Sequence, residues 1–138
     1  MSLTAIANGI RDILIPIVDP DPVQIGPWPP KLTNGTAFPD RAVSMTPYVV
    51  EDNDETGQYV RAVQVRIRGR QGESIADLFD RQDAVWAAIV EPTALVFPTL
   101  TVVMAWRQMS APLGLDAQGR PEIADTYYLR SDRLGRSG

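Results

Sequence analysis

The side chains that most often carry out chemistry in proteins are nearly absent from this sequence. It holds neither histidine nor cysteine, which removes imidazole bases, thiolate nucleophiles, disulfides and Cys/His zinc sites. Its only lysine, Lys31, lies in a proline-rich stretch. Ser110 and Ser131 therefore lack a basic partner of the kind that activates a serine nucleophile. We expect no enzymatic activity, no cofactor and no metal site.

Acidic side chains form two groups that could in principle transfer protons or bind a cation. Asp77, Asp80 and Asp83 recur along a predicted helix, but paired carboxylates do acid–base chemistry only in a pocket that raises the pKa of one of them. Segment 52–57 begins like a calcium loop, yet position twelve is Val63, where such a loop needs glutamate. A solvated helix face and a solvated hairpin turn explain both groups better.

The composition indicates one acidic globular domain. The chain has 138 residues, of which 44% are hydrophobic and 22% charged, and a single core usually occupies about 100–150 residues. We therefore expect residues 1–138 to form one domain. The net charge of −4 argues against nonspecific nucleic-acid binding, which requires a cationic surface.

No membrane segment is expected. No apolar run approaches the roughly 20 residues that span a bilayer, and the first residues lack the cationic start and the cleavage site of a secretory signal. The sequence predicts a protein that is made and used in solution.

Hydrophobic spacing predicts a first helix followed by a long arm. Residues 2–14 carry apolar side chains at helical intervals, and Ser2 or Thr4 can cap the amino end. Seven of the twelve prolines lie between positions 16 and 39. Because proline lacks a backbone donor, residues 16–42 should form a proline-rich arm or loop, with at most a short strand near 23–25.

Two aromatic side chains of this arm, Trp28 and Phe38, favour docking on a surface. They could fold back over the core of their own domain, or they could pack against a neighbouring subunit. Both alternatives remain open.

The remainder of the chain predicts a hairpin, a second helix and two further strands. Residues 43–50 and 59–69 should form an antiparallel hairpin, joined by an acidic turn at 51–57. Ser74 and Asp77 resemble a capping box at the start of a helix over 74–90. The apolar stripe of that helix is expected to contain Ile75, Leu78, Phe79, Trp86 and Ile89.

The last strands are expected at about 99–108 and 123–131, separated by a loop with turn signals at Pro112, Gly114 and 116–119. Residues 133–138 should form a flexible tail. These elements predict an α+β fold with a mixed, mostly antiparallel sheet of about four strands and two helices on one face.

The other face of the predicted sheet is not polar enough to stand in water alone. Both sides of the strand at 99–108 are apolar, whereas a half-covered sheet should alternate more cleanly. Either the arm or a neighbouring subunit should cover part of it. Arg66 and Arg68 form a basic strand edge, which is either a solvated face or a contact for the acidic turn of a neighbour in a ring.

The carboxy-terminal half resembles the tail terminator, or minor capsid, proteins of long-tailed bacteriophages. The resemblance covers about 90 of the 138 residues. It lies in VQVRIRGR at 63–70, in the helix ADLFDRQDAVWAAI and in AWRQMSAPLGLDAQGRPEIADTYYLR at 105–130. Within the last segment it depends on Trp106 to Gln108, on Ala111 to Gly114, on Asp116 with Gly119 and Arg120, and on Asp125 with Tyr127 and Tyr128.

The resemblance implies a structural protein of the virion, located in the tail at the neck and made in the cytoplasm of the host bacterium. It implies a homohexameric ring that stops the growth of the tail tube and joins it to a neck, or stopper, protein, while genomic DNA passes through the lumen. The alternatives are another neck ring (a head completion or stopper protein), a tail tube subunit, a small-ligand binding domain or a carboxylate enzyme.

These considerations assign no catalytic, cofactor-binding or metal-binding residue. The residues expected at assembly interfaces are Trp28, Phe38, Glu51, Asp52, Asp54, Glu55, Arg66, Arg68, Trp106, Arg107, Leu113, Arg120 and Tyr128.

Overall fold

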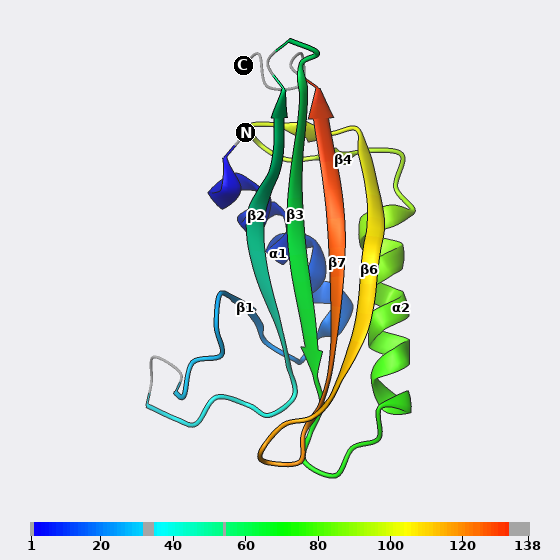
Figure 1. The fold of residues 1–138 in the computed structure, drawn as a ribbon. Coiled ribbons are helices and arrows are strands. Elements are labelled where there is room, and N and C mark those ends of the chain that lie inside the picture. The colour runs from blue at the N-terminus through cyan, green and yellow to red at the C-terminus, as the bar shows by residue number, and fades with distance from the viewer. Residues whose placement is uncertain (1, 32–34, 54, 133–138) are drawn as a thin grey trace.

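The structure is a computed structural model that describes residues 2–31, 35–53 and 55–132 (Figure 1). The predicted flexible tail at 133–138 lies outside the described residues. In chain order the described elements are α1 (Leu3–Val18), β1 (Val23–Ile25), β2 (Ala42–Asn53), β3 (Gln58–Arg68), α2 (Ala76–Val90), β4 (Leu95–Val96), β5 (Thr101–Val102), β6 (Met104–Leu115) and β7 (Pro121–Asp132).

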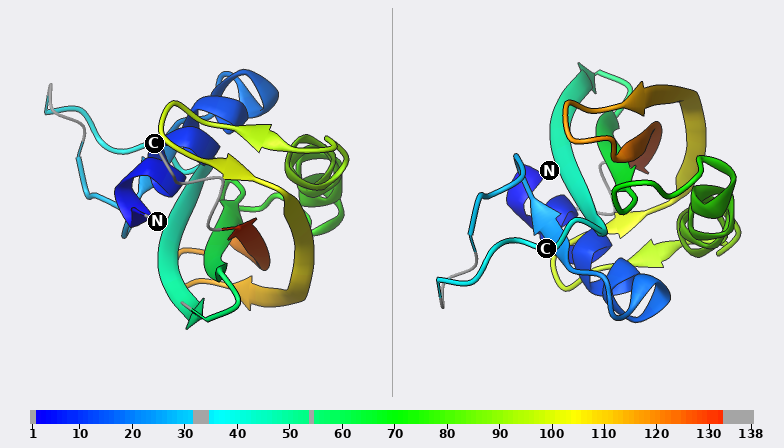
Figure 2. Two further views of the ribbon diagram at one scale, coloured as in Figure 1. Left: turned by 90° about the horizontal axis from the view of Figure 1, so that it is seen from above. Right: turned by 90° about the horizontal axis from the view of Figure 1, so that it is seen from below.

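The strands build one large mixed sheet and one small sheet. The large sheet has the order β1-β2-β3-β7-β6, and β4 pairs with β5 in the small one. β1 runs parallel to β2, whereas all other neighbours in the large sheet are antiparallel. Both helices lie behind the sheet (Figure 1), and the views from above and below place them on the same side of it (Figure 2). The predicted α+β class is confirmed, with five strands instead of about four because β1 joins the sheet.

The hydrophobic core lies between the helices and the sheet. Helix residues three or four positions apart point inward, and alternate residues of β3 meet them. Residues 63–67 therefore alternate between buried and partly exposed side chains, in step with the apolar and polar residues of the sequence. Buried members of the core include Ile6, Ile10 and Leu14 of α1, Val63, Val65 and Ile67 of β3, and Leu78, Val85 and Ile89 of α2.

Helix α1 is longer than the predicted 2–14. The side chain of Ser2 accepts a hydrogen bond from the backbone N–H of Ala5 (3.3 Å), as expected of a cap. The helix then continues through Pro16 to Val18. Proline removes one backbone donor in this last turn, but the turn buries Val18 in the core. The arm therefore begins after Val18, and its expected short strand is present as β1.

Helix α2 begins at Ala76 with half of the predicted capping box. The backbone N–H of Ser74 donates to Asp77 Oδ2 (3.2 Å), but Ile75 occupies the cap position without a side-chain hydrogen bond. Phe79 was expected in the apolar stripe and is instead 48% exposed. The buried positions of α2 are 78, 81, 85 and 89, a spacing that Phe79 does not share.

The largest departure from the sequence prediction is β6. A loop was predicted after residue 108, yet β6 continues to Leu115 and pairs with β7 throughout. Register shifts after Arg107 and Pro112 each absorb one extra residue. Because β6 is an edge strand, proline can be accommodated where its missing N–H would face outward. The turn itself forms at 116–119, where Gly119 has φ +75°.

Candidate functional site

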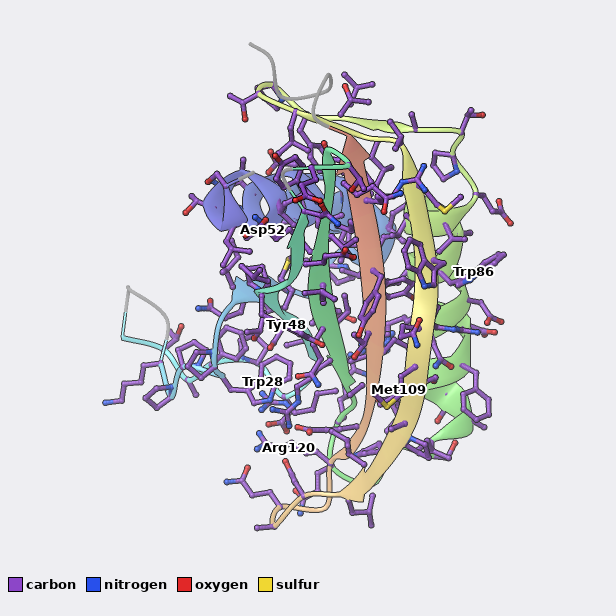
Figure 3. The ribbon with its side chains drawn as sticks, turned by 45° about the horizontal axis from the view of Figure 1, so that its top comes forward. Trp28, Tyr48, Asp52, Trp86, Met109 and Arg120 are labelled. Atoms are coloured by element: carbon purple, nitrogen blue, oxygen red, sulfur yellow. The ribbon has the colours of Figure 1, made fainter. Side chains whose placement is uncertain are left out.

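The sheet face that points away from the helices, which we call the outer face, carries aromatic and sulfur-containing side chains. Register places Trp106 beside Tyr128 on this face, and their rings meet edge to face at 5.7 Å. Tyr48 of β2 and Met109 of β6 lie on the same face, 42% and 59% exposed (Figure 3). No described helix covers the outer face. Apolar side chains therefore lie on both sides of β6 at 104–106, as expected for this strand, whereas β3 and β7 place polar side chains such as Gln64 and Thr126 on the outer face.

The arm covers the part of the outer face nearest the 116–119 turn. The guanidinium of Arg68 lies 4.3 Å from the centre of the Trp28 ring, and that of Arg66 lies 5.9 Å from it. Phe38 packs on Trp28 with ring centres 6.2 Å apart. Arg68 also donates to the carbonyl oxygens of Asp40 (2.6 Å) and Pro39 (2.9 Å). Of the two alternatives for Trp28 and Phe38, the structure has them docked on their own domain.

A cavity of about 430 Å³ lies between this arm and the sheet. Trp28, Phe38 and Arg68 line it, together with Gln118 and Arg120 of the turn before β7. The Nε1–H group of Trp28 is buried and has no acceptor among the described residues. The cavity brings together four residues that the sequence analysis had singled out, although they are up to 92 positions apart.

The basic residues of this region are held by partners within the chain. Arg66 pairs with Glu122, while Arg120 binds Asp116 (2.7 Å) and Asp40 (3.0 Å). Burial lowers the pKa of Arg68 below its ordinary value. Burial also acts to lower the pKa of Arg120, but hydrogen bonds to Asp116 and Asp40 outweigh it and raise that pKa. The expected basic edge is therefore an intramolecular network.

The acidic turn lies at the other end of the hairpin from this network. Pairing runs from Ala42 opposite Arg68 to Asn53 opposite Gln58, a separation of about ten residues or roughly 30 Å at the usual rise of a strand. Asn53 Oδ1 accepts hydrogen bonds from the backbone N–H groups of residues 55 and 56, both at 3.1 Å. The expected contact between the turn and the arginines is therefore not made within one chain.

Within the turn, the predicted interface residues have different surroundings. Asp52 Oδ1 lies 2.7 Å from Nη2 of the buried Arg61, whereas the side chains of Glu51 and Glu55 are exposed. Asp54 lies outside the described residues. The turn forms the hairpin predicted from its composition.

A buried polar cluster connects β7 to α2 on the inner side of the sheet. Asp125 accepts hydrogen bonds from Gln82 Nε2 (2.9 and 3.1 Å) and lies 3.4 Å from Arg107 Nη1. Burial and the neighbouring Asp125 raise the pKa of Tyr127 above its ordinary value. Ser110 only accepts a hydrogen bond from Gln82 (2.9 Å). This cluster orients strand and helix, and it presents no activated nucleophile.

A second polar network, which sequence analysis missed, anchors the start of the arm. Asp21 Oδ2 lies 2.8 Å from Arg81 Nη1 of α2 and 3.1 Å from Arg41 Nε. Burial lowers the pKa of Arg81, although Asp21 and Glu73 oppose that effect. The opposite charges of Asp21 and Arg81 can be read from the sequence, but their separation by 60 residues gives no indication that they pair.

Other exposed apolar residues were also missed. Met104, Met109 and Tyr48 were not selected, although they lie on the same face as Trp106 and Tyr128. For Met104 the signal was the apolar character of both sides of the strand predicted at 99–108. Leu113, which was selected, is 48% exposed on β6.

No set of acidic residues in the described ranges is arranged to hold a metal ion. None of the described helices is both long and apolar enough to cross a membrane.

Comparison with known proteins identifies a fold. No family model matches the chain, and no curated protein matches it. Among solved structures, a chain of the "Virion of native gene transfer agent (GTA) particle" has a TM-score of 0.72. It is 18% identical, with 94% of this chain and 96% of that chain covered. A TM-score of 0.72 over nearly the whole length of both chains shows that they share a fold.

Proposed function

We propose that this chain is a structural protein of a phage-like virion particle. The observation that carries the proposal is the fold, shared along nearly its whole length with a chain of a virion particle. The exposed aromatic and methionine side chains of the outer face support it, since apolar surface of this kind is typical of interaction sites. The chain acts through its surfaces and without catalysis.

Within such a particle we assign the chain to the tail terminator, a homohexameric ring at the head-proximal end of the tail. It would stop the growth of the tail tube and join the tail to a neck protein. The motifs at 105–130 support this position, and the structure gives them a common role: Asp116, Gly119 and Arg120 form the turn between β6 and β7, while Trp106 and Tyr128 pair across the two strands. The acidic balance of the chain suits a lumen through which DNA passes without being bound.

Deletion of the gene in a strain that produces the particles tests this assignment. Electron microscopy should show overlong tails without heads, because nothing stops the tube. Tails of normal length that lack heads would indicate another neck ring, and heads without any tail tube would indicate a tube subunit. Normal tails joined to heads would overturn the proposal.

A further inference from the structure

The backbone of the large sheet is exposed along two edges. β6 has one neighbour, β7, so its other edge is unpaired over the described length. Nine of its twelve residues are exposed and the other three are partly exposed. On the opposite side, β1 pairs with β2 only at Val43–Met45. The burial of β2 changes at that point, from buried at 42–45 to largely exposed at 46–53.

Unpaired strand edges are usually protected because they can pair with another chain. Charged residues, prolines and bulges provide that protection. In β6, Pro112 and the second register shift lie in the half near the 116–119 turn. The other half, 104–109, contains the first register shift but no proline, and its only charged side chain, Arg107, is directed to Asp125 within the sheet. Residues 104–109 therefore form the less protected half of the edge.

The exposed half of β2, like this half of β6, contains one register shift, between Val49 and Glu51, and Pro47 removes one backbone donor near its start. Residues 46–53 carry no basic side chain and residues 104–109 carry no acid, so joining them opposes no like charges. Asp52 and Arg107 already pair with Arg61 and Asp125 within the chain. Both segments expose large apolar groups: Tyr48 and Val49 on β2, Met104 and Met109 on β6. Joining the two edges would bury apolar surface from both and would continue the outer face without interruption.

Strand directions permit this pairing between identical chains. Three antiparallel steps separate β2 from β6 in the sheet, so the two strands run in opposite directions. A rotation about an axis parallel to the strands preserves these directions and keeps the outer faces on one side. The β6 edge of one copy and the β2 edge of the next would then meet as an antiparallel pair, a head-to-tail contact that forms a ring when successive rotations complete a full turn.

We propose that residues 104–109 of β6 pair with residues 46–53 of β2 in a second copy of this chain, so that the sheet continues from subunit to subunit. The contact specifies how the subunits of the proposed ring would join, and its biological role depends on that proposed function. The arm and β1 restrict the pairing to these halves, because β1 already occupies β2 at 43–45.

The pairing across the sheet selects residues for a test. Through β7 and β3, Met104 lies at the level of Glu51, and Met109 lies at the level of Thr46. All four are exposed and on the outer face. The chain holds no cysteine, so introduced cysteines are the only thiols. A short bismaleimide linker tolerates a shift of about two residues, or roughly 7 Å along the strand.

Full-length chains that each carry one substitution are purified, mixed in pairs at millimolar concentration and treated with the bismaleimide linker. Met104→Cys mixed with Glu51→Cys should give linked dimers on a denaturing gel, whereas either variant alone should not, because the contact is head to tail. Met109→Cys mixed with Thr46→Cys should behave in the same way. The variant that carries both Met104→Cys and Glu51→Cys should give a ladder of linked chains.

The matched control is Phe79→Cys mixed with Val96→Cys, two exposed residues of α2 and β4 away from both edges. This mixture should give only the background of random collision. Linkage of the edge pairs at that background level would overturn the proposal, as would linkage of Met104→Cys to itself. Circular dichroism confirms that every variant used is folded.

This test and the gene deletion fail independently. Linked edges together with normal tails after deletion would leave the contact valid and refute the tail assignment. Unlinked edges together with overlong tails would leave the tail assignment valid and refute the contact.

Discussion

The substitution Asp21→Asn tests whether the buried ion pair with Arg81 holds the arm to α2. Both side chains are nearly buried, at 8% and 9% exposure, with 2.8 Å between Asp21 Oδ2 and Arg81 Nη1. The amide keeps the size of the side chain but removes the charge that compensates the guanidinium. Breaking a buried ion pair by changing one partner costs about 3–5 kcal/mol. We expect about 3 kcal/mol, since Glu73 remains 3.6 Å from Arg81 Nη2.

The corresponding change in melting temperature follows from chain length. For 138 residues, the entropy of unfolding is about 0.3 kcal/mol per kelvin. A loss of about 3 kcal/mol therefore lowers Tm by about 10 °C. Urea unfolding followed by circular dichroism should show a lower midpoint and an unchanged dependence on urea.

Two further variants separate the effect of the buried ion pair from a general effect of removing a charge. Asp12→Asn removes a carboxylate that is 72% exposed and lies 3.7 Å from Arg11, so it should change stability little. Adding Arg81→Met to Asp21→Asn should recover part of the loss, because the buried guanidinium is then removed. Glu73, which is 11% exposed, keeps the hydrogen bond from the backbone N–H of Arg70 (2.8 Å). If Asp21→Asn were as stable as the unchanged chain, the ion pair would not anchor the arm.

Three other substitutions have definite expected outcomes. Gly9→Ala should destabilise the fold by about 1–3 kcal/mol in urea unfolding, because a Cβ at this position would lie 2.6 Å from a carbon of the Phe97 ring. Trp28→Ala should lower the free energy of unfolding by about 1–2 kcal/mol, since it removes aromatic contacts with Phe38 and the cation–π contact with Arg68. Tyr127→Phe should weaken the loss of stability at alkaline pH. The pKa of Tyr127 is raised by folding, so the folded state resists ionisation and stability falls as pH rises above about 10, the ordinary tyrosine pKa.

Each of these three has a contrary outcome, and the first two have a control. Asn8→Ala, one position before Gly9 and partly exposed, should be nearly neutral, and a neutral Gly9→Ala would show that Phe97 moves freely. Pro27→Ala, exposed beside Trp28, controls for the arm, and an unchanged stability of Trp28→Ala would mean that the arm contributes nothing. For Tyr127→Phe, an alkaline slope equal to that of the unchanged chain would refute the assignment to Tyr127.

The local elements were largely predictable because their causes are local. The hairpin at 42–68 follows from alternation and from an acidic turn, and α2 follows from helical spacing. β6 was not predictable beyond residue 108, since Pro112 and Gly114 normally indicate a loop. Pairing with β7 overrides these local preferences, and the two register shifts show how the ladder accommodates them.

The candidate interface was predictable only in part. Trp28 and Phe38 were identified as aromatics that must dock, but their target, Arg68, depends on how the arm crosses the sheet. Arg66 and Arg68 were expected either on a solvated face or in contact with a neighbour, yet Glu122 and the arm carbonyls of residues 39 and 40 bind them. Charge and hydrophobicity are visible in a sequence, whereas the partner of each side chain is decided by elements distant along the chain.

The amino-acid sequence shows which reactive side chains this protein lacks, and it indicates most of its strands and helices. Without histidine or cysteine it excludes whole classes of chemistry, and its periodicities predict an α+β domain. The tertiary structure alone decided which surfaces are free. Strand order leaves the β6 edge unpaired, β1 covers only part of β2, and the arm covers one end of the outer face. These are consequences of long-range pairing, and no local pattern of residues encodes them.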